Sequence, residues 1–293
     1  MRGITICNIR RRGSFSLGVR TPGGILDVAA AAKARRVRAP MTTDEVIRGT
    51  ELAGLRRILA AKTTAAFLVP EAKAVFGPCV LSPGKLLLMG LNYRRHAAEV
   101  KLPLPETPTF FSKFNNTLLG HGGVIELPKS ESSKFDYEAE LVIVIGKKAQ
   151  RVPPEAALAC VFGYATGNDF SARDLQFKTS QWLLGKTCDG FAPLGPWLVS
   201  ADLVKDPQNL AVRCSVNGEV RQSSNTSDMI FSCAQLISYA SRHMTLLPGD
   251  VIFTGTPEGV IQGKPEAERV WLKAGDQLAT EIEGLGELRF SLA

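Results

Sequence analysis

The sequence predicts a mixed α/β, strand-rich protein with a small N-terminal domain (residues 1–75) followed by a larger domain (residues 76–293). The length of 293 residues exceeds the usual size of a single domain. Residues 1–75 contain alanine-rich stretches with helical periodicity. After residue 75 the chain changes to many short β-branched runs separated by Gly, Pro and Asp. Such runs indicate a sandwich or barrel rather than alternating βαβ units.

The N-terminal domain is expected to begin with a hairpin-like stretch over residues 4–27. Helical sequence follows at residues 28–33 and 43–62. A linker comes next and is marked by Pro70, Pro78, Pro83 and Gly84. None of this sequence has a pattern typical of a chemical site, so the functional residues are expected beyond residue 75.

The larger domain is expected to contain nine strands and one clear helix. The predicted strands cover residues 85–89, 123–127, 139–145, 160–166, 197–199, 211–216, 250–254, 277–282 and 286–291. Asn217 and Gly218 form the two-residue turn typical of a β-hairpin. The helix has an N-terminal cap signal at Ser227 and Asp228, and apolar residues then recur at helical spacing up to Met244.

Composition excludes several classes of protein. Much of the net charge of +7 lies in two clusters, residues 10–12 and 33–38, and neither is interleaved with aromatic residues. A solvated basic face explains them better than a nucleic-acid site does. No apolar run approaches the ~20 residues of a membrane span, and the N-terminus lacks the pattern of a secretory signal. Six scattered cysteines without a Cys-x-x-Cys pair fit reduced thiols in the cytoplasm.

Glu138 and Glu140 form the first candidate site. In an extended chain, residues i and i+2 point to the same side, roughly 6.5–7 Å apart. The run after Glu140 is typical of a buried strand, where two like charges are costly unless a cation neutralises them. Asp169 follows another apolar run and adds a third carboxylate. Such oxygen ligands suit Mg²⁺ or Mn²⁺, with Ca²⁺ as a further option. The alternative is an exposed strand whose glutamates bind nothing.

His96 and Glu99 form the second candidate site. They lie three residues apart in a short polar helix that follows a glycine-led turn at Gly90, so they can form a hydrogen bond on one helical face. A carboxylate that holds an imidazole is the usual arrangement of a general base. The alternative is an exposed surface pair.

Lys186 and a glycine-rich loop complete the set of candidates. Lys186 ends the apolar stretch that begins at Trp182, and a lysine there needs an anionic partner. The loop Thr254-Gly-Thr-Pro-Glu-Gly259 can bring backbone amides and Thr256 close to a small ligand. The alternative for this loop is an ordinary turn.

Together and in this order, these motifs resemble the fumarylacetoacetate hydrolase (FAH) family over roughly residues 85–292. The matching motifs are Gly-x-Asn-Tyr-x-x-His-x-x-Glu, Asp-Tyr-Glu-x-Glu, Asn-Asp-x-(Ser/Thr)-Ala-Arg-Asp-Leu-Gln, Gly-Lys-(Thr/Ser)-x-Asp with Pro-Leu-Gly-Pro, Val-Asn-Gly-Glu, and Pro-Gly-Asp-Val-Ile-x-Thr-Gly-Thr-Pro-x-Gly-Val. The resemblance implies an FAH-type mixed β-sandwich roll, usually a homodimer. The N-terminal segment matches only the longer members, and weakly.

The resemblance also implies a role for each candidate residue. Glu138, Glu140 and Asp169 would be the metal ligands. His96 and Glu99 would be a catalytic dyad on a lid that becomes ordered when substrate binds.

Four further residues would act around this centre. Lys186 would stabilise enolate charge, and Gln176 and Thr256 would hold the carboxylate or oxo group of the substrate. Arg173, grouped with the substrate-binding residues, would support the metal ligands.

The implied activity is that of a cytoplasmic, metal-dependent hydrolase. It would cleave a C–C bond in a small 2,4-dioxo acid, of the acylpyruvate or fumarylpyruvate type, through an enolate at the metal. His96 would draw a proton from water, and the hydroxide would attack the distal carbonyl. The alternatives are decarboxylation of oxaloacetate, and isomerisation or hydration of an unsaturated oxo-diacid from aromatic catabolism. A non-catalytic binding protein is disfavoured because no expected polar residue is substituted.

Specificity is expected from the lid and from pocket residues. The lid and its flanks cover residues 94–104, and Tyr137 and Phe191 are the expected pocket residues. Arg94 and Arg95 suggest a dianionic substrate, with a solvated surface pair as the alternative.

Overall fold

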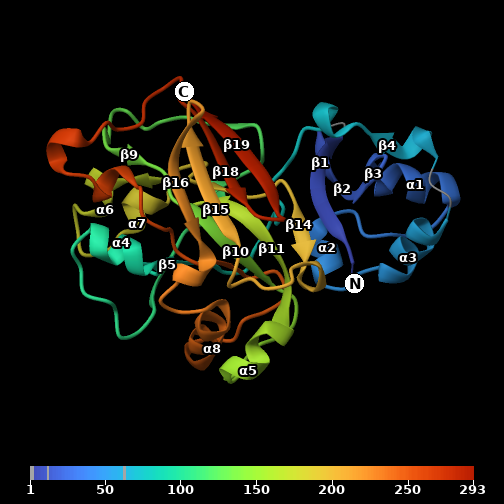
Figure 1. Cartoon of the computed structure of the whole chain (residues 1–293). Coiled ribbons are helices and arrows are strands. Elements are labelled where there is room, and N and C mark those ends of the chain that lie inside the picture. The colour runs from blue at the N-terminus through green and yellow to red at the C-terminus, as the bar shows by residue number, and fades with distance from the viewer. Residues whose placement is uncertain (1–2, 12, 62–63) are drawn as a thin grey trace.

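The computed structural model describes residues 3–11, 13–61 and 64–293. Arg12 of the first basic cluster and Lys62 at the end of the predicted helix 43–62 lie outside the described residues. The described chain forms two large sheets and two small ones, with short helices around them (Figure 1). This arrangement confirms the predicted mixed α/β, strand-rich class.

The larger sheet contains ten strands and includes the N-terminal strands. In spatial order they are β4 (Leu68–Val69), β3 (Gly24–Asp27), β2 (Ser14–Thr21), β1 (Thr5–Arg11), β14 (Leu198–Ser200), β11 (Val161–Asn168), β10 (Ala139–Ile145), β17 (Val251–Phe253), β5 (Leu86–Gly90) and β6 (Thr109–Ser112). All neighbouring pairs in this sheet are antiparallel except β17 with β5.

The second sheet contains five strands, four from the C-terminal half and one from the middle of the chain. In order they are β16 (Glu219–Asn225), β15 (Ala211–Val216), β18 (Gln277–Ile282), β19 (Gly286–Leu292) and β8 (Gly123–Ile125). The small sheets pair β12 (Ser171–Ala172) with β9 (Phe135–Asp136), and β13 (Ala192–Pro193) with β7 (Leu118–Leu119).

The helices are short. The α-helices are α1 (Val28–Arg35), α2 (Thr43–Ile47), α3 (Leu52–Ala60), α4 (Arg94–Glu99), α5 (Pro154–Ala157), α6 (Arg173–Gln176), α7 (Leu183–Lys186) and α8 (Cys233–His243). The 3₁₀ turns are η1 (Ala65–Phe67), η2 (Glu71–Lys73), η3 (Asn115–Thr117), η4 (Leu158–Cys160), η5 (Ala201–Leu203), η6 (Thr226–Asp228), η7 (Ile261–Gly263) and η8 (Glu266–Glu268). In Figure 1, α1–α3 lie with β1–β4 on one side, and α4, α6 and α7 lie on the opposite side.

Strand β10 is buried on both faces, which explains its unbroken apolar sequence. Leu141 and Ile143 point into one hydrophobic cluster, whereas Val142 and Val144 belong to the other. Alternate side chains of a strand face opposite sides, so β10 separates two cores. Glu140, at the start of this strand, therefore lies in a dry environment.

The turn between β15 and β16 is confirmed as a two-residue hairpin. Asn217 and Gly218 both have positive φ, at 53° and 84°, as this turn type requires. Strands β10, β15 and β18 begin and end at the predicted residues.

Two predicted helices need correction. Residues 43–62 do not form one helix, because left-handed backbone at Gly49 and Glu51 (φ 83° and 51°) separates α2 from α3. The later helix, α8, begins at Cys233 rather than after Ser227, which lies in η6. Ser232 caps α8: its hydroxyl accepts a hydrogen bond from the backbone N–H of Gln235, whose side chain accepts one in return.

The N-terminal strands continue the larger sheet. Thr5 pairs with Val199 and Ile6 with Leu198, which joins β1 to β14. Whether residues 1–75 form a domain of their own stays a prediction.

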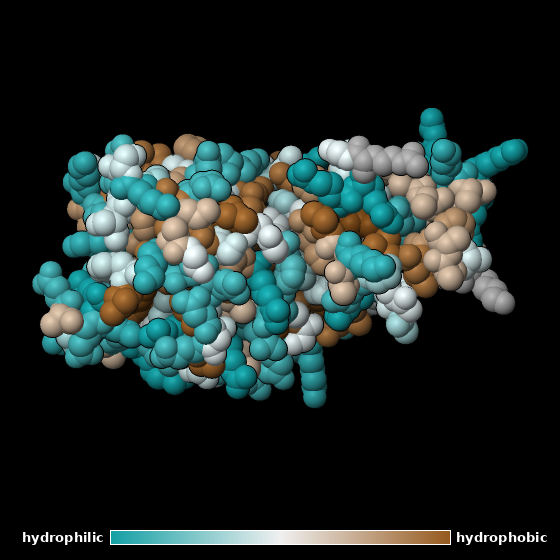
Figure 2. All heavy atoms as spheres, turned by 90° about the horizontal axis from the view of Figure 1, so that it is seen from above, coloured by the Kyte–Doolittle hydropathy of each residue, from teal (hydrophilic) through white to brown (hydrophobic). Residues whose placement is uncertain are grey.

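Apolar side chains gather mainly inside the molecule. The face in Figure 2 is covered largely by polar residues, with apolar residues in scattered patches. None of the helices in the described part of the chain has both the length and the apolar character that crossing a bilayer requires.

Candidate active site

A cavity of about 250 Å³ lies beside α4, α6 and α7, at the ends of β5 and β10. Its wall combines acidic, basic and apolar side chains. It is lined by Met89, Gly90, Leu91, His96, Val100, Leu102, Phe111, Glu138, Glu140, Arg173, Gln176, Phe177, Trp182, Lys186, Thr256 and Gln262. The cavity thus contains seven of the nine predicted site residues.

Glu138, Glu140 and Asp169 come together as a buried triad. Each offers one carboxylate oxygen, and these oxygens lie within 4.8 Å of one another. Strand pairing explains the arrangement, because Ala139 of β10 lies opposite Asn168 of β11. The residues on either side of this pair are therefore neighbours, and the backbone N–H of Asp169 donates to the carbonyl oxygen of Glu138 at 2.9 Å.

Lys186 lies between two members of the triad. Its Nζ is 2.7 Å from Glu138 Oε2, 2.7 Å from Asp169 Oδ2 and 2.7 Å from Ser171 Oγ. The side chain is buried, where an unpaired ammonium would be costly. The anionic partner that the sequence predicted for Lys186 is confirmed.

Lys113 is a second buried lysine of the site, and sequence reasoning missed it. Its Nζ forms an ion pair with Asp169 Oδ1 at 2.5 Å, and it donates to the carbonyl oxygens of Phe170 and Phe191. Burial lowers the pKa of Lys113, although Asp169 opposes this shift. The sequence carried a usable signal, because Lys113 ends the run Phe110-Phe-Ser just as Lys186 ends its own apolar stretch.

Arg173 connects the triad to a fourth buried carboxylate, that of Asp136. Its Nη2 is 2.6 Å from Glu138 Oε1 and 2.9 Å from Asp136 Oδ2, and its Nη1 donates to Gln176 Oε1 at 2.9 Å. The expected support of a metal ligand by Arg173 agrees with this geometry. Asp136 was not identified from the sequence.

The three triad carboxylates differ in their tendency to ionise. Burial raises the pKa of Glu140 well above its usual value, and the neighbouring charges of Asp169 and Glu138 raise it further. Burial also raises the pKa of Asp169, against the opposing effect of Lys113. Burial also acts to raise the pKa of Glu138. The charges of Arg173 and Lys186 outweigh this effect and hold the pKa of Glu138 below its usual value.

The donor set fits a hard divalent cation. It consists of carboxylate oxygens alone, which Mg²⁺, Mn²⁺ and Ca²⁺ prefer. Each ionised carboxylate keeps acceptor capacity beyond the contacts described above. The four buried carboxylates (Glu138, Glu140, Asp169, Asp136) and three buried cations (Lys113, Lys186, Arg173) leave one formal negative charge. A divalent cation would reverse that sign, which would favour an anionic ligand.

His96 and Glu99 form the predicted pair on α4. His96 Nδ1 is 2.9 Å from Glu99 Oε2, and the backbone N–H of Gly259 donates to Glu99 Oε1 at 2.9 Å. Glu99 is thus held on both oxygens. An imidazole whose Nδ1–H donates to a carboxylate has Nε2 left as its basic nitrogen, and His96 lines the cavity.

Gln176 and Thr256 also line the cavity, and their predicted contacts with substrate stay predictions. The Oε1 atom of Gln176 accepts from Arg173, which leaves the amide NH₂ group for other acceptors. The hydroxyl of Thr256 donates to the carbonyl oxygen of Ala139 and accepts from Gln222.

Four residues expected to set specificity do not line this cavity. The hydroxyl of Tyr137 donates to the carbonyl oxygen of Gly259, and Phe191 is a core residue. Arg95 forms ion pairs with Asp228 and Glu258, and Arg94 donates to the carbonyl oxygens of Asp228 and Met229. Neither arginine lines the cavity, and their suggested role with a dianionic substrate stays a prediction.

Comparison with known proteins adds to this geometry. The family model described as "Fumarylacetoacetate (FAA) hydrolase C-terminal" matches residues 85–293. Oxaloacetate tautomerase Fahd2a, mitochondrial, of Rattus norvegicus is 44% identical over 238 residues, which cover 81% of this chain and 74% of the relative.

Two solved structures extend the similarity to the whole fold. Fumarylacetoacetate hydrolase from Exiguobacterium antarcticum has a TM-score of 0.83 and 32% identity, with 99% of each chain covered. Maleylpyruvate hydrolase from Sphingobium has a TM-score of 0.77 and 31% identity, again with 99% of each chain covered. Both similarities include the N-terminal segment, which the sequence resemblance matched only weakly.

Proposed function

The chain belongs to the fumarylacetoacetate hydrolase family, and from this premise we propose that it interconverts the keto and enol forms of oxaloacetate or a closely similar 2-oxo diacid. The observation that carries the proposal is that His96, hydrogen-bonded to Glu99, lines the same cavity as Glu138 and Glu140 of the acidic triad. The name of the rat relative, an oxaloacetate tautomerase, supports the same chemistry.

His96 is the general base of this reaction. Its Nε2 takes a proton from C3 of the keto form, the electron pair of that C–H bond forms the C2–C3 double bond, and the π electrons of the C2 carbonyl move to its oxygen, which takes the proton from His96. The reverse sequence returns the keto form, so no atom is lost. Glu99 orients the ring through Nδ1. A positioned base of this kind contributes roughly 10²–10⁴-fold to the rate.

Other side chains bind the substrate and balance its charge. A divalent cation held by Glu138, Glu140 and Asp169 would supply Lewis acidity at the 2-oxo and carboxylate oxygens. The Lys186 ammonium offsets negative charge that develops on the substrate oxygen. The amide NH₂ group of Gln176 donates to a substrate carboxylate.

Hydrolysis of an acylpyruvate is the second candidate, and the apolar part of the cavity favours it. The apolar lining residues are Met89, Leu91, Val100, Leu102, Phe111, Phe177 and Trp182. An uncharged acyl group would bury its surface against them. In the described part of the chain, the basic side chains that line the cavity besides His96 are Arg173 and Lys186, and both already have acidic partners.

A substrate panel tests these functions against each other. The purified protein, with Mg²⁺ and after EDTA treatment, is assayed with enol-oxaloacetate, acetylpyruvate and fumarylpyruvate. Loss of the enol absorbance without pyruvate formation supports the tautomerase. Pyruvate from acetylpyruvate or fumarylpyruvate supports the hydrolase, and pyruvate from oxaloacetate indicates decarboxylation. No turnover of any of them would contradict both proposals and favour a binding protein.

Substitution of His96 tests the base directly. His96→Ala should lower kcat roughly 10²–10⁴-fold with either substrate class and leave Mn²⁺ affinity unchanged, because His96 is not part of the triad. His243→Ala, at an exposed position, is the matched control. Near-normal turnover by His96→Ala would refute the assigned mechanism.

A homodimer and a cytoplasmic location stay predictions. The rat relative is named as mitochondrial, which is a property of that protein. Sedimentation of the purified chain would measure its oligomeric state.

A further inference from the structure

Asp136, at the edge of the site, accepts hydrogen bonds from the guanidinium of Arg173 and from three backbone amides. It is fully buried in β9 and binds the guanidinium of Arg173 through Nε and Nη2, both at 2.9 Å. It also accepts from the backbone N–H groups of Tyr137 (2.9 Å), Ile261 (2.9 Å) and Gln262 (3.0 Å). Hydrogen bonds to an ionised acceptor are stronger than neutral ones, so Asp136 fixes two consecutive amides of η7 firmly to β9.

The segment anchored in this way, residues 259–263, is also the segment that holds Glu99. The backbone N–H of Gly259 donates to Glu99 Oε1. At the other end, a Cβ atom on Gly263 would lie only 2.3 Å from Glu99 Cδ. Glycine is therefore needed for this close approach, and Glu99 packs directly on the segment.

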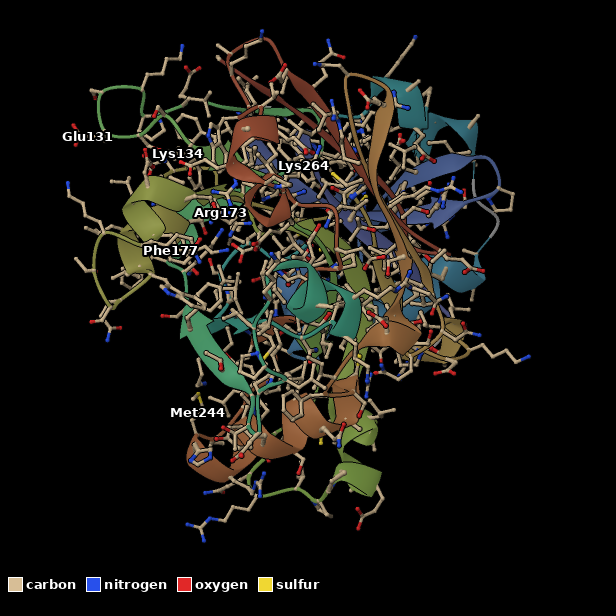
Figure 3. All side chains as sticks on the ribbon, turned by 60° about the vertical axis from the view of Figure 1, so that its left-hand side comes forward. Glu131, Lys134, Arg173, Phe177, Met244 and Lys264 are labelled. Atoms are coloured by element: carbon tan, nitrogen blue, oxygen red, sulfur yellow. The ribbon has the colours of Figure 1, made fainter. Side chains whose placement is uncertain are left out.

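The two sides of the cavity meet at these contacts. Arg173 joins Asp136 to Glu138 of the triad, and Asp136 joins Arg173 to residues 259–263 and so to Glu99. Figure 3 labels Arg173, on α6, and Lys264, the residue that directly follows the segment 259–263. A continuous chain of hydrogen bonds and close packing thus leads from a metal-ligand candidate to the acid–base pair.

We propose that Asp136 is a positioning residue for the His96–Glu99 pair, acting through residues 259–263. The inference rests on the proposed function, in which His96 is the base. Asp136 does not itself line the cavity, and its hydrogen bonds join it to Arg173 and to the amides of Tyr137, Ile261 and Gln262 rather than to His96. It sets the position of the Gly259 amide and of Gly263, and these in turn set the carboxylate that orients the imidazole.

Asp136→Asn is the primary test. The side chain keeps its shape, but its NH₂ group places donors against the donors of Arg173 or of η7. We expect kcat to fall roughly 10–100-fold, as for other residues that orient a functional group, with KM changed less than about 3-fold. Asp174→Asn is the matched control, because Asp174 also accepts from two backbone amides, but these belong to Ser133 and Leu175 rather than to residues 259–263.

A double-mutant cycle separates positioning from general destabilisation. If Asp136 acts through Glu99, then Asp136→Asn should lower kcat little further in a Glu99→Gln background, because residues acting as a unit are not additive. Independent, multiplicative losses would overturn the proposal.

A spectroscopic measurement makes the test independent of activity. The chain has three histidines, His96, His121 and His243, so their ring ¹⁵N resonances can be assigned in the metal-free protein. Asp136→Asn should shift the ring resonances of His96 toward a mixture of tautomers and leave the other two unchanged. Gly263→Ala, which disturbs Glu99 without touching the Arg173 ion pair, should do the same and serves if Asp136→Asn does not fold.

The outcomes distinguish a failure of the positioning role of Asp136 from a failure of the proposed function. Unchanged His96 resonances in both variants would refute the positioning role. Full activity of Glu99→Gln would instead refute the proposed function, and the ¹⁵N comparison would still decide the role of Asp136.

Discussion

Glu140 is the triad carboxylate whose ionisation its surroundings oppose most. It is 1% exposed, its neighbours Glu138 and Asp169 carry the same charge, and its described hydrogen-bond donor is the backbone N–H of Gly255. A divalent cation is the natural partner for such a group. Glu140 is therefore the residue at which a metal site is tested most directly.

Glu140→Gln should weaken Mn²⁺ binding at least ~100-fold, because even residues that only support a ligand cost 10–100-fold. The metal-free variant should be at least as stable as the metal-free parent, since the amide removes a buried ionisable group. Isothermal titration calorimetry measures the affinity, with the exposed Glu131→Gln as control. Equal affinities for Glu140→Gln and the parent would exclude the triad as the metal site.

Metal binding should release protons and strengthen with pH. The raised pKa values of Glu140 and Asp169 mean that these groups keep a proton to higher pH than ordinary carboxyls do. A cation competes with those protons, so its affinity should rise as pH increases above the usual carboxyl range. Calorimetry in two buffers of different ionisation enthalpy counts the protons. Identical heats in both buffers would contradict the expectation.

Individual site residues were predictable where the sequence placed a charge at the end of an apolar run. This pattern identified Glu140, Asp169 and Lys186, and it would have identified Lys113 had it been applied there. Asp136 could not be found in this way. Its importance depends on amides of Ile261 and Gln262, which are more than 120 residues away in the chain.

Helix α8 shows how local chemistry decides where an element begins. The apolar residues Ile230 and Phe231 fit the helical spacing but lie before the helix, whereas Ser232 and Gln235 form a capping box. Ser-x-x-Gln is a recognised capping motif at the start of helices, so the start of α8 could have been predicted from the sequence.

Ser232→Ala should destabilise the protein by about 1 kcal/mol, because it removes an N-cap hydrogen bond. Ser227→Ala should be nearly neutral, since this exposed residue lies in η6 rather than at the start of α8. Urea unfolding monitored by circular dichroism measures both. A larger loss of stability for Ser227→Ala than for Ser232→Ala would instead support a helix that starts after Ser227.

Strands were predictable in proportion to their length and burial. Strand β10 has seven residues and β18 has six, and both match the prediction. Strands β9 and β12 have two residues each, which is too short for an alternating pattern to be recognised. Yet β9 carries Asp136, and β12 comes directly before Arg173. The strands that were not predicted are therefore close to the candidate active site.

The arrangement of the whole molecule depends on pairings between distant parts of the chain. The join between β1 and β14 brings together residues almost 200 positions apart, and no local pattern records it. The candidate active site likewise combines residues from different parts of the chain. Its triad lies at the paired ends of β10 and β11, with Glu140 in β10, Glu138 directly before it and Asp169 directly after β11. Lys186 and Arg173 come from α7 and α6.

A cation at the triad should therefore stabilise the whole fold. A ligand at 100 times its Kd adds about 2.7 kcal/mol when it binds only the folded state. For a chain of this size that corresponds to roughly 5 °C or more in Tm. Thermal unfolding with Mg²⁺ or Mn²⁺ and then with excess EDTA measures the shift, which EDTA should reverse. Glu140→Gln should show almost none of it. An equal shift in Glu140→Gln would mean that the cation stabilises the fold at some other site.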